Sequence, residues 1–215
     1  IVQSAFTTAG QRCTAARRLI VVDSVFDKIV PAVKALAEKL IVDEPFADPQ
    51  PFMGCVIDNQ TADLLHESFL ALMSRGGQPI LHMKRPQEDR PFLTPAIIDT
   101  TEMHERPDIE LFGPLLQVIR VPDFDAAIVE ANNTRYGLAA NIWTENINEA
   151  MHVAAQLKAG TVWVNSANNF DASVGFGGYR ESGFGREGGP EGLTEYLQRN
   201  PRGSDRPFEQ RQSKS

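Results

Sequence analysis

The chain has 215 residues with 42% hydrophobic and 23% charged side chains, which excludes a disordered, collagen-like or coiled-coil protein. It contains no apolar run of about 18 residues and its start does not resemble a signal peptide, so neither a membrane nor secretion is indicated. The net charge of −7 argues against nucleic acid as a partner, and two cysteines without a CxxC pair favour a reducing, cytoplasmic setting.

The first half of the sequence predicts strands and helices separated by polar or proline-rich connections. Arg18–Val22 is rich in β-branched residues and predicts a buried strand. Ser24 is a candidate N-cap, and Pro31 predicts a kink or a delayed start in the helix that follows. In chain order, the expected elements are a strand at 18–22, a helix at 24–40, a loop at 43–51, a helix at 61–75, a strand at 79–83 and a turn at 84–91.

The second half continues this alternation and then changes character. The expected elements are a strand at 115–121, a helix capped by Asp123, a strand at 139–144, a helix at 149–158 and a strand at 161–165. Strands that alternate with helices predict an α/β domain with a mostly parallel sheet flanked by helices. Residues 175–192 carry eight glycines and predict a loop. We expect one domain over 1–198, followed by a polar, disordered tail at 199–215.

Cys13 is the first candidate for chemistry. It lies in Gly10-Gln11-Arg12-Cys13-Thr14, where the glycine allows a close backbone approach and the arginine adds positive charge. A catalytic cysteine must be a thiolate with space for an electrophile. The alternative is a buried structural cysteine, which is the commoner case for a lone thiol. Cys55 has apolar neighbours and is interpreted as structural.

A second candidate is the segment Glu110-Leu111-Phe112-Gly113-Pro114. Gly-Pro predicts a rigid turn ahead of a strand, where a carboxylate and an aromatic ring two residues apart can present together. Such a pair can hold a sugar diol and brace a flat ring. The segment is equally compatible with a turn that carries a core phenylalanine.

Two other patterns do not support a site. Gly183–Gly188 matches G-x-G-x-x-G, but it follows another glycine-rich stretch rather than a strand, so a dinucleotide-binding fingerprint is rejected. The four histidines are scattered without the spacing of metal ligands, and no metal site is expected.

Four motifs together resemble the aldehyde dehydrogenase superfamily, in the family's order and spacing over residues 1–198. They are Gly10-Gln11-Arg12-Cys13-Thr14-Ala15-Ala16-Arg17-Arg18, Glu110-Leu111-Phe112-Gly113-Pro114, Asn132-Asn133-Thr134-Arg135-Tyr136-Gly137-Leu138 and the segment 176–187. The resemblance implies the fold of an aldehyde dehydrogenase catalytic domain. It also implies that Cys13 is the nucleophile and outweighs the structural interpretation of that residue.

The resemblance further implies an NAD- or NADP-dependent oxidation of an aldehyde to a carboxylic acid, through a thiohemiacetal and a thioester on Cys13. The Cys13 N–H is then expected to form part of the oxyanion hole. Glu110 matches the glutamate that binds the nicotinamide ribose, and Phe112 matches the aromatic residue beside the nicotinamide. Positions on the substrate side are matched by Asn165, Phe170 and Phe176.

The resemblance covers the catalytic and C-terminal part of the family. The cofactor domain, the general-base glutamate and the oxyanion asparagine lie upstream of the cysteine in the family, so we expect this chain to be a fragment that is inactive alone. The full-length parent is expected to form a homo-oligomer. The alternative is a non-catalytic, truncated pseudoenzyme that binds full-length subunits. A third interpretation is a cysteine hydrolase, which would need a histidine partner for Cys13. None of the four histidines lies in a recognisable context for that role.

The substrate is less defined by the resemblance. Residues 1–18, 46–54 and 112–121 resemble succinylglutamate-semialdehyde dehydrogenases, whereas 170–196 resembles a broader bacterial group. The aldehyde therefore stays open, with that enzyme as a candidate.

Overall fold

A computed structural model describes residues 1–197, so the tail expected at 199–215 lies outside the described residues. The helices and strands, in chain order, are α1 (Val2–Phe6), the 3₁₀ element η1 (Thr7–Gly10), β1 (Arg18–Val22), α2 (Asp23–Ala37), α3 (Asn59–Ser74), β2 (Gln78–Leu81), β3 (Ala96–Asp99), β4 (Leu115–Val121), α4 (Phe124–Asn132), β5 (Ala139–Ile142), α5 (Ile147–Gln156), β6 (Thr161–Val164), the 3₁₀ element η2 (Arg180–Ser182) and α6 (Gly189–Thr194).

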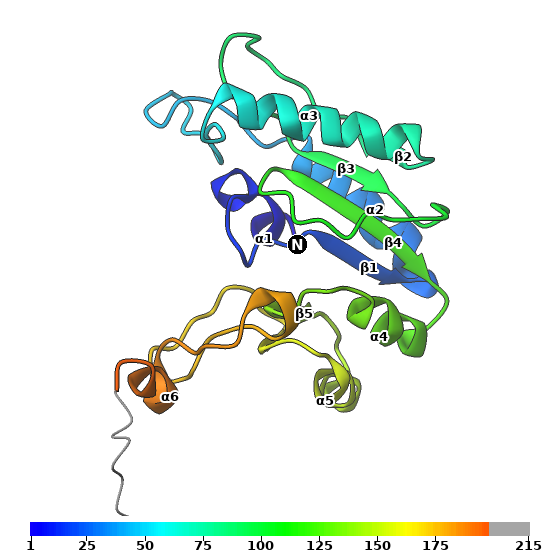
Figure 1. Cartoon of the computed structure of the whole chain (residues 1–215). Helices are drawn as coiled ribbons and strands as arrows, with labels where there is room; N and C mark the ends of the chain where they lie inside the picture. The colour runs from blue at the N-terminus through cyan, green and yellow to red at the C-terminus, as the bar shows by residue number, and fades with distance from the viewer. Residues whose placement is uncertain (198–215) are drawn as a thin grey trace, which may run out of the picture.

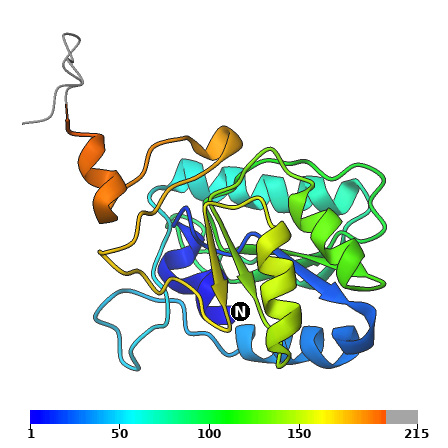
Figure 2. The same cartoon turned by 90° about the horizontal axis from the view of Figure 1, so that it is seen from below.

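The strands form two sheets rather than one. A four-stranded sheet has the order β1-β4-β3-β2, in which β4 runs parallel to both β1 and β3 while β2 is antiparallel to β3. β5 and β6 form a separate, parallel two-stranded sheet. Figure 2 shows α5 beside the smaller sheet and α6 near the end of the described chain. The predicted α/β class with mostly parallel pairing is confirmed.

The hydrophobic core centres on β3 and β4, which lie inside the larger sheet. Ile97, Ile98 and Leu116 are completely buried there, and Leu65 and Phe69 of α3 pack into the same cluster. α2 packs on β1 and β4 behind the sheet in the view of Figure 1. β1 is an edge strand with only Val21 fully buried, so the expectation of a buried strand at this position is wrong.

The helix after β1 differs from its expected form. α2 begins at Asp23, which places Ser24 inside the first turn instead of at the N-cap. The helix also continues through Pro31. A proline in a helix interior removes one backbone hydrogen bond, but Val30 and Val33 on either side of it are buried. Most helical stability in proteins comes from packing of the apolar face, and here packing outweighs the local cost.

Several short elements were not expected, β3 and α6 among them. In β3, three successive residues are buried and Asp99 is half-buried, so no alternation reveals the strand. α6 lies within the glycine-rich stretch, where Pro190 occupies the first turn of a six-residue helix. Near it, Phe176 and Glu187 form an isolated antiparallel bridge, so the expected loop at 175–192 is partly ordered into short elements.

Candidate active site

Cys13 lies on a turn that exposes its thiol. The N–H of Ala15 donates to the carbonyl of Arg12 at 3.0 Å and closes the turn, with Cys13 at its second position. Cys13 is exposed, and among the hydrogen bonds within residues 1–197 none uses its N–H as a donor. An exposed thiol and an unused backbone donor therefore belong to the same residue.

The backbone that leads into this turn is strained. Thr8, Ala9 and Gly10 have φ values of 57°, 54° and 69°, in the left-handed region that non-glycine residues seldom adopt. Each such residue other than glycine costs about 1–3 kcal/mol, and strain of this kind often occurs at functional sites. The surrounding contacts must therefore hold the segment in place.

Gln11 supplies much of that support. Its Nε2 donates to the carbonyl of Thr8 at 3.2 Å and to that of Cys55 at 3.4 Å. Its Oε1 accepts from the N–H of Ile57 at 3.0 Å. Sequence reasoning quoted Gln11 only as part of a motif and missed this positioning role, because the partners lie more than 40 positions away.

The strained segment before the cysteine turn is in direct contact with the segment containing Glu110 at two glycines. A Cβ built on Gly10 would lie 2.1 Å from the carbonyl oxygen of Gly113, and one on Gly113 would lie 2.4 Å from Leu65 of α3. Only glycine allows this approach. A recess of about 20 Å³ lies at the junction. Its lining residues are Gly10, Arg12, Ala15, Ala16, Arg17, Glu110, Leu111, Phe112, Gly113 and Leu115.

Glu110 and Phe112 both present side chains to this recess. Phe112 is 43% exposed, so it is not a core phenylalanine. Partial burial raises the pKa of the Glu110 carboxyl, and the charge of Arg17 opposes that rise. No hydrogen bond within residues 1–197 uses the Glu110 carboxylate. An aromatic face and an acceptor group are therefore available to a ligand beside the cysteine turn.

Asp108 ties this segment to two others. It pairs with Arg17 at 2.9 Å and accepts from the Thr134 hydroxyl at 2.9 Å and the Arg135 N–H at 2.7 Å. Arg17 also donates to the carbonyl of Ile109 at 3.0 Å. Partial burial raises the pKa of Asp108, but these hydrogen bonds outweigh burial and leave it below its ordinary value. Asp108 was not among the expected site residues.

The expected substrate-side residues form a separate group. Phe170 packs edge-on against Trp163 and Phe176, with ring centroids 5.4 and 5.0 Å away. The Asn165 side chain accepts from the N–H of Thr144 at 3.0 Å and donates to its carbonyl at 2.9 Å. Asn165 thereby joins the ends of β5 and β6. No hydrogen bond within residues 1–197 joins this group to Cys13, and its substrate role stays a prediction.

Cys55 is also exposed, so the apolar setting expected for it is wrong. Met53 and Val56 take the buried positions of that segment and leave the Cys55 side chain outside. Exposure alone therefore does not distinguish the two thiols. Within the described part of the chain, no group of three or more metal-ligating side chains occurs and no helix is long and apolar enough to cross a membrane.

Comparison with known proteins places these features in one family. Residues 1–200 match the model of the aldehyde dehydrogenase family, and the chain belongs to it. The fold is similar to betaine aldehyde dehydrogenase from Staphylococcus aureus, crystallised in complex with NAD⁺, with a TM-score of 0.85 and 32% identity over 91% of this chain and 39% of that one. An aldehyde dehydrogenase from Bacillus cereus matches with a TM-score of 0.83, 30% identity and coverage of 91% and 40%.

Curated relatives are more similar in sequence. An N-succinylglutamate 5-semialdehyde dehydrogenase from Novosphingobium aromaticivorans is 59% identical over 85% of this chain and 39% of its own length. One from Sphingopyxis alaskensis is 57% identical over 85% of this chain and 38% of its own length. The chain thus spans about two-fifths of the length of the relatives it matches.

Proposed function

We propose that the chain is the nucleophile-bearing part of a nicotinamide-dependent aldehyde dehydrogenase, which oxidises an aldehyde to a carboxylic acid through Cys13. The observation that carries this proposal is the contact between Gly10 and Gly113. That contact joins the segment that precedes the exposed Cys13 to the segment bearing Glu110 and Phe112.

The chemistry proposed for Cys13 is nucleophilic addition followed by release. The thiolate sulfur bonds to the aldehyde carbon, and the carbonyl oxygen takes up the electron pair and becomes an oxyanion. The Cys13 N–H donates to that oxygen as part of an oxyanion hole. Loss of a hydride from the same carbon leaves a thioester on Cys13. Water then cleaves the carbon–sulfur bond, which gives the acid and restores the thiolate.

Glu110 and Phe112 fit one end of a nicotinamide dinucleotide, which supplies the hydride acceptor when bound. The unpaired Glu110 carboxylate suits the hydroxyls of a ribose, and the exposed Phe112 ring suits the face of a flat heterocycle. The Staphylococcus aureus relative was crystallised with NAD⁺. NAD⁺ rather than NADP⁺ is therefore the cofactor we propose.

N-Succinylglutamate 5-semialdehyde is the substrate we propose. Two relatives that carry this substrate in their names are 59% and 57% identical to the chain over 85% of its length. Phe170, Phe176 and Asn165 remain the proposed substrate-side residues. The aromatic group containing Phe170 and Phe176 offers an apolar wall, since Phe170 is 54% exposed.

Addition of an aldehyde to Cys13 can be tested without turnover. Succinate semialdehyde labelled with ¹³C at the aldehyde carbon is mixed with the chain and followed by NMR. A thiohemiacetal resonance is expected in the unmodified chain and in Cys55→Ser, and its loss is expected in Cys13→Ser. A signal that persists in Cys13→Ser but disappears in Cys55→Ser contradicts the proposal. Matched circular dichroism spectra establish that both variants are folded.

A further inference from the structure

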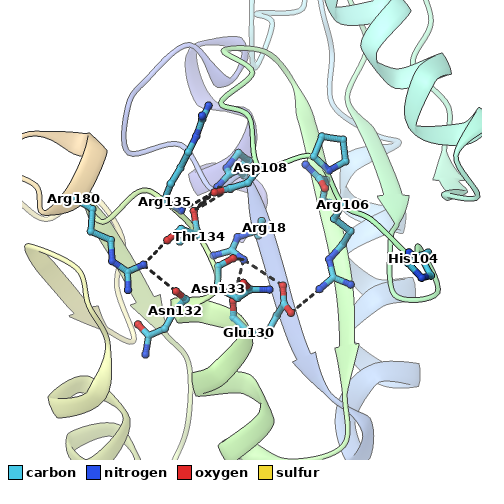
Figure 3. Close-up of a pocket in the computed structure, with 13 residues that line it drawn as sticks. Arg18, His104, Arg106, Asp108, Glu130, Asn132, Asn133, Thr134, Arg135 and Arg180 are labelled. Atoms are coloured by element: carbon cyan, nitrogen blue, oxygen red, sulfur yellow. Dashed lines mark hydrogen bonds and ion pairs between the residues drawn. The ribbon is translucent and has the colours of Figure 1, made fainter.

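A polar cavity of about 440 Å³ is lined by Arg17 and Arg18, at the start of β1, and takes no part in the proposed reaction. It is bounded by β1, the segment before Asp108 and the chain that links α4 to β5 (Figure 3). Five arginines and only two carboxylates line it, in a chain whose overall charge is −7. The arginines are Arg17, Arg18, Arg106, Arg135 and Arg180.

The ion pairs of these arginines leave positive charge uncompensated. Arg18 and Arg106 share the single carboxylate of Glu130, at 3.3 and 2.6 Å. Arg17 pairs with Asp108, and Arg135 lies 3.5 Å from a carboxylate outside the cavity, that of Glu181. Within residues 1–197, Arg180 has no carboxylate partner. Two positive charges of the cavity lining are thus left without a negative one.

Backbone carbonyls satisfy several guanidinium donors but do not neutralise their charge. Arg180 donates to the carbonyls of Asn132, at 2.9 Å, and Thr134. Arg18 donates to the carbonyls of Glu130 and Ala131 at 3.0 and 2.9 Å. Burial and the adjacent charge of Arg17 lower the pKa of Arg18, as expected where cations are crowded. An anion entering the cavity would relieve this crowding.

One uncompensated charge belongs to Arg180, and the other belongs to the Arg18–Arg106 pair that shares Glu130. Arg106 is the more exposed member of that pair, with 24% of its side chain exposed against 16% for Arg18. The guanidinium of Arg106 is therefore accessible to solvent while remaining partly desolvated. In Figure 3, Arg180 and Arg106 approach from opposite sides, with Arg18 and Asn133 between them. A compact ion does not fill a space of about 440 Å³.

We propose that this cavity binds an elongated dianion, a dicarboxylate with one carboxylate against Arg106 and the other against Arg180. Guanidinium groups recognise carboxylates through charge-assisted, often bidentate hydrogen bonds. The two carboxylates match in number the two charges left by Arg180 and by the Arg18–Arg106 pair. This binding site is distinct from the recess beside Cys13, although Arg17 borders both.

Calorimetric titration of the 215-residue chain tests the proposal at constant ionic strength. The probes are malonate, glutarate and adipate as dicarboxylates of increasing length, inorganic phosphate as a compact dianion and acetate as a monoanion. Glutarate or adipate is expected to bind about tenfold more tightly than phosphate or acetate, because only the longer molecules make both charge contacts. Absence of saturable binding, or phosphate binding as tightly as the best dicarboxylate, would overturn the proposal.

Variants locate the two contacts. Arg106→Gln and Arg180→Gln are each expected to weaken binding of the best dicarboxylate about tenfold, whereas Arg75→Gln, at an exposed position after α3, leaves it unchanged. Arg106→Lys and Arg180→Lys keep the charge and are expected to retain most of the affinity. An affinity that is unchanged in either glutamine variant contradicts a two-ended site. If a glutamine variant fails to fold, the proposal is tested by the calorimetric titrations of the unmodified chain with the dicarboxylates, phosphate and acetate.

Discussion

Cys13 and Cys55 differ in their backbone surroundings rather than in exposure. Both thiols are exposed, but Cys13 follows a strained segment, Thr8 to Gly10, whose last residue contacts Gly113. A nucleophile needs an approach path and a donor for the oxygen that becomes negative. The turn provides both, because it presents the side chain and leaves the Cys13 N–H unused within residues 1–197.

Replacement of Gly10 by alanine is expected to destabilise the fold strongly. The new Cβ would lie 2.1 Å from the Gly113 carbonyl, and φ of +69° is unfavourable for alanine. Strain and overpacking together predict a loss of roughly 3–5 kcal/mol in unfolding free energy. Gly76→Ala is the control, since φ there is +103° but no atom lies within 4 Å. Urea denaturation should show a clearly smaller loss for the control; equal losses would mean that the close contact is absent.

Glu110→Gln is expected to change how stability depends on pH. The pKa of Glu110 is raised in the fold, so the folded chain holds this proton more tightly than the unfolded chain. The contribution of protonated Glu110 to the unfolding free energy is fully present below the ordinary glutamate pKa. It is lost as pH rises through the raised pKa of the folded chain. The unmodified chain should therefore lose stability relative to Glu110→Gln over that interval. Denaturation at a series of pH values measures this difference. A gain in stability of the unmodified chain over Glu110→Gln with rising pH would contradict the prediction.

At the scale of elements, those with clear periodicity or caps were predictable. Asp123 accepts from the N–H of Ala126 and caps α4 as expected, and β4 matches its predicted range. In contrast, β3 has three successive buried residues and no alternation, and its assignment depends on pairing with β4. Pairing between distant segments is a tertiary property, which explains why the local pattern did not reveal it.

The candidate site was predictable only in its motif residues. Local sequence offers Cys13, Glu110 and Phe112 as candidates beside structural alternatives, and the resemblance to the aldehyde dehydrogenase superfamily favours their functional roles. The structure brings the segments that carry them together. Gln11 and Asp108 hold these segments through partners 44 and 91 positions away. Such contacts have no local signature, so residues that position the site are the part that sequence reasoning missed.

Asp108→Ala is expected to loosen the junction of three segments. It removes the acceptors of Arg17, Thr134 and the Arg135 N–H. Hydrogen bonds to charged groups contribute about 1.5–3 kcal/mol each, so a net loss of about 2–3 kcal/mol is expected at neutral pH. Because the pKa of Asp108 is lowered in the fold, this loss should diminish as pH falls through its ordinary value.

The control for this variant is Asp63→Ala, which removes an exposed ion pair with Arg85. Exposed pairs contribute about 0–1 kcal/mol. Thermal or urea denaturation compares the two variants. Equal, small losses for both would show that Asp108 does not hold the junction.

At the scale of the whole molecule, two sheets are joined by polar contacts. Arg180 of η2 and Asp108 both bind the segment at 132–135, which links α4 to β5. The chain spans about two-fifths of the length of its curated relatives. Formation of a homo-oligomer by the full-length parent stays a prediction.

The 215-residue polypeptide is expected to produce no NADH from aldehyde and NAD⁺. Hydride transfer needs the nicotinamide held against the reacting carbon, and such positioning supplies roughly 7–11 kcal/mol of a barrier. The recess offers contacts for only one end of a dinucleotide. Absorbance of NADH and calorimetric titration with NAD⁺ measure turnover and affinity. Turnover at ordinary enzyme rates or micromolar affinity would contradict this expectation.

Reactivity of the two thiols tests the central claim most directly, because both are exposed and only their surroundings differ. The folded chain is treated with a limiting amount of iodoacetamide near neutral pH, and the adducts are mapped by mass spectrometry. The claim that Cys13 is the nucleophile predicts that Cys13 is alkylated first and that unfolding in urea abolishes the difference. Alkylation of Cys55 at an equal or greater rate in the folded chain would contradict it.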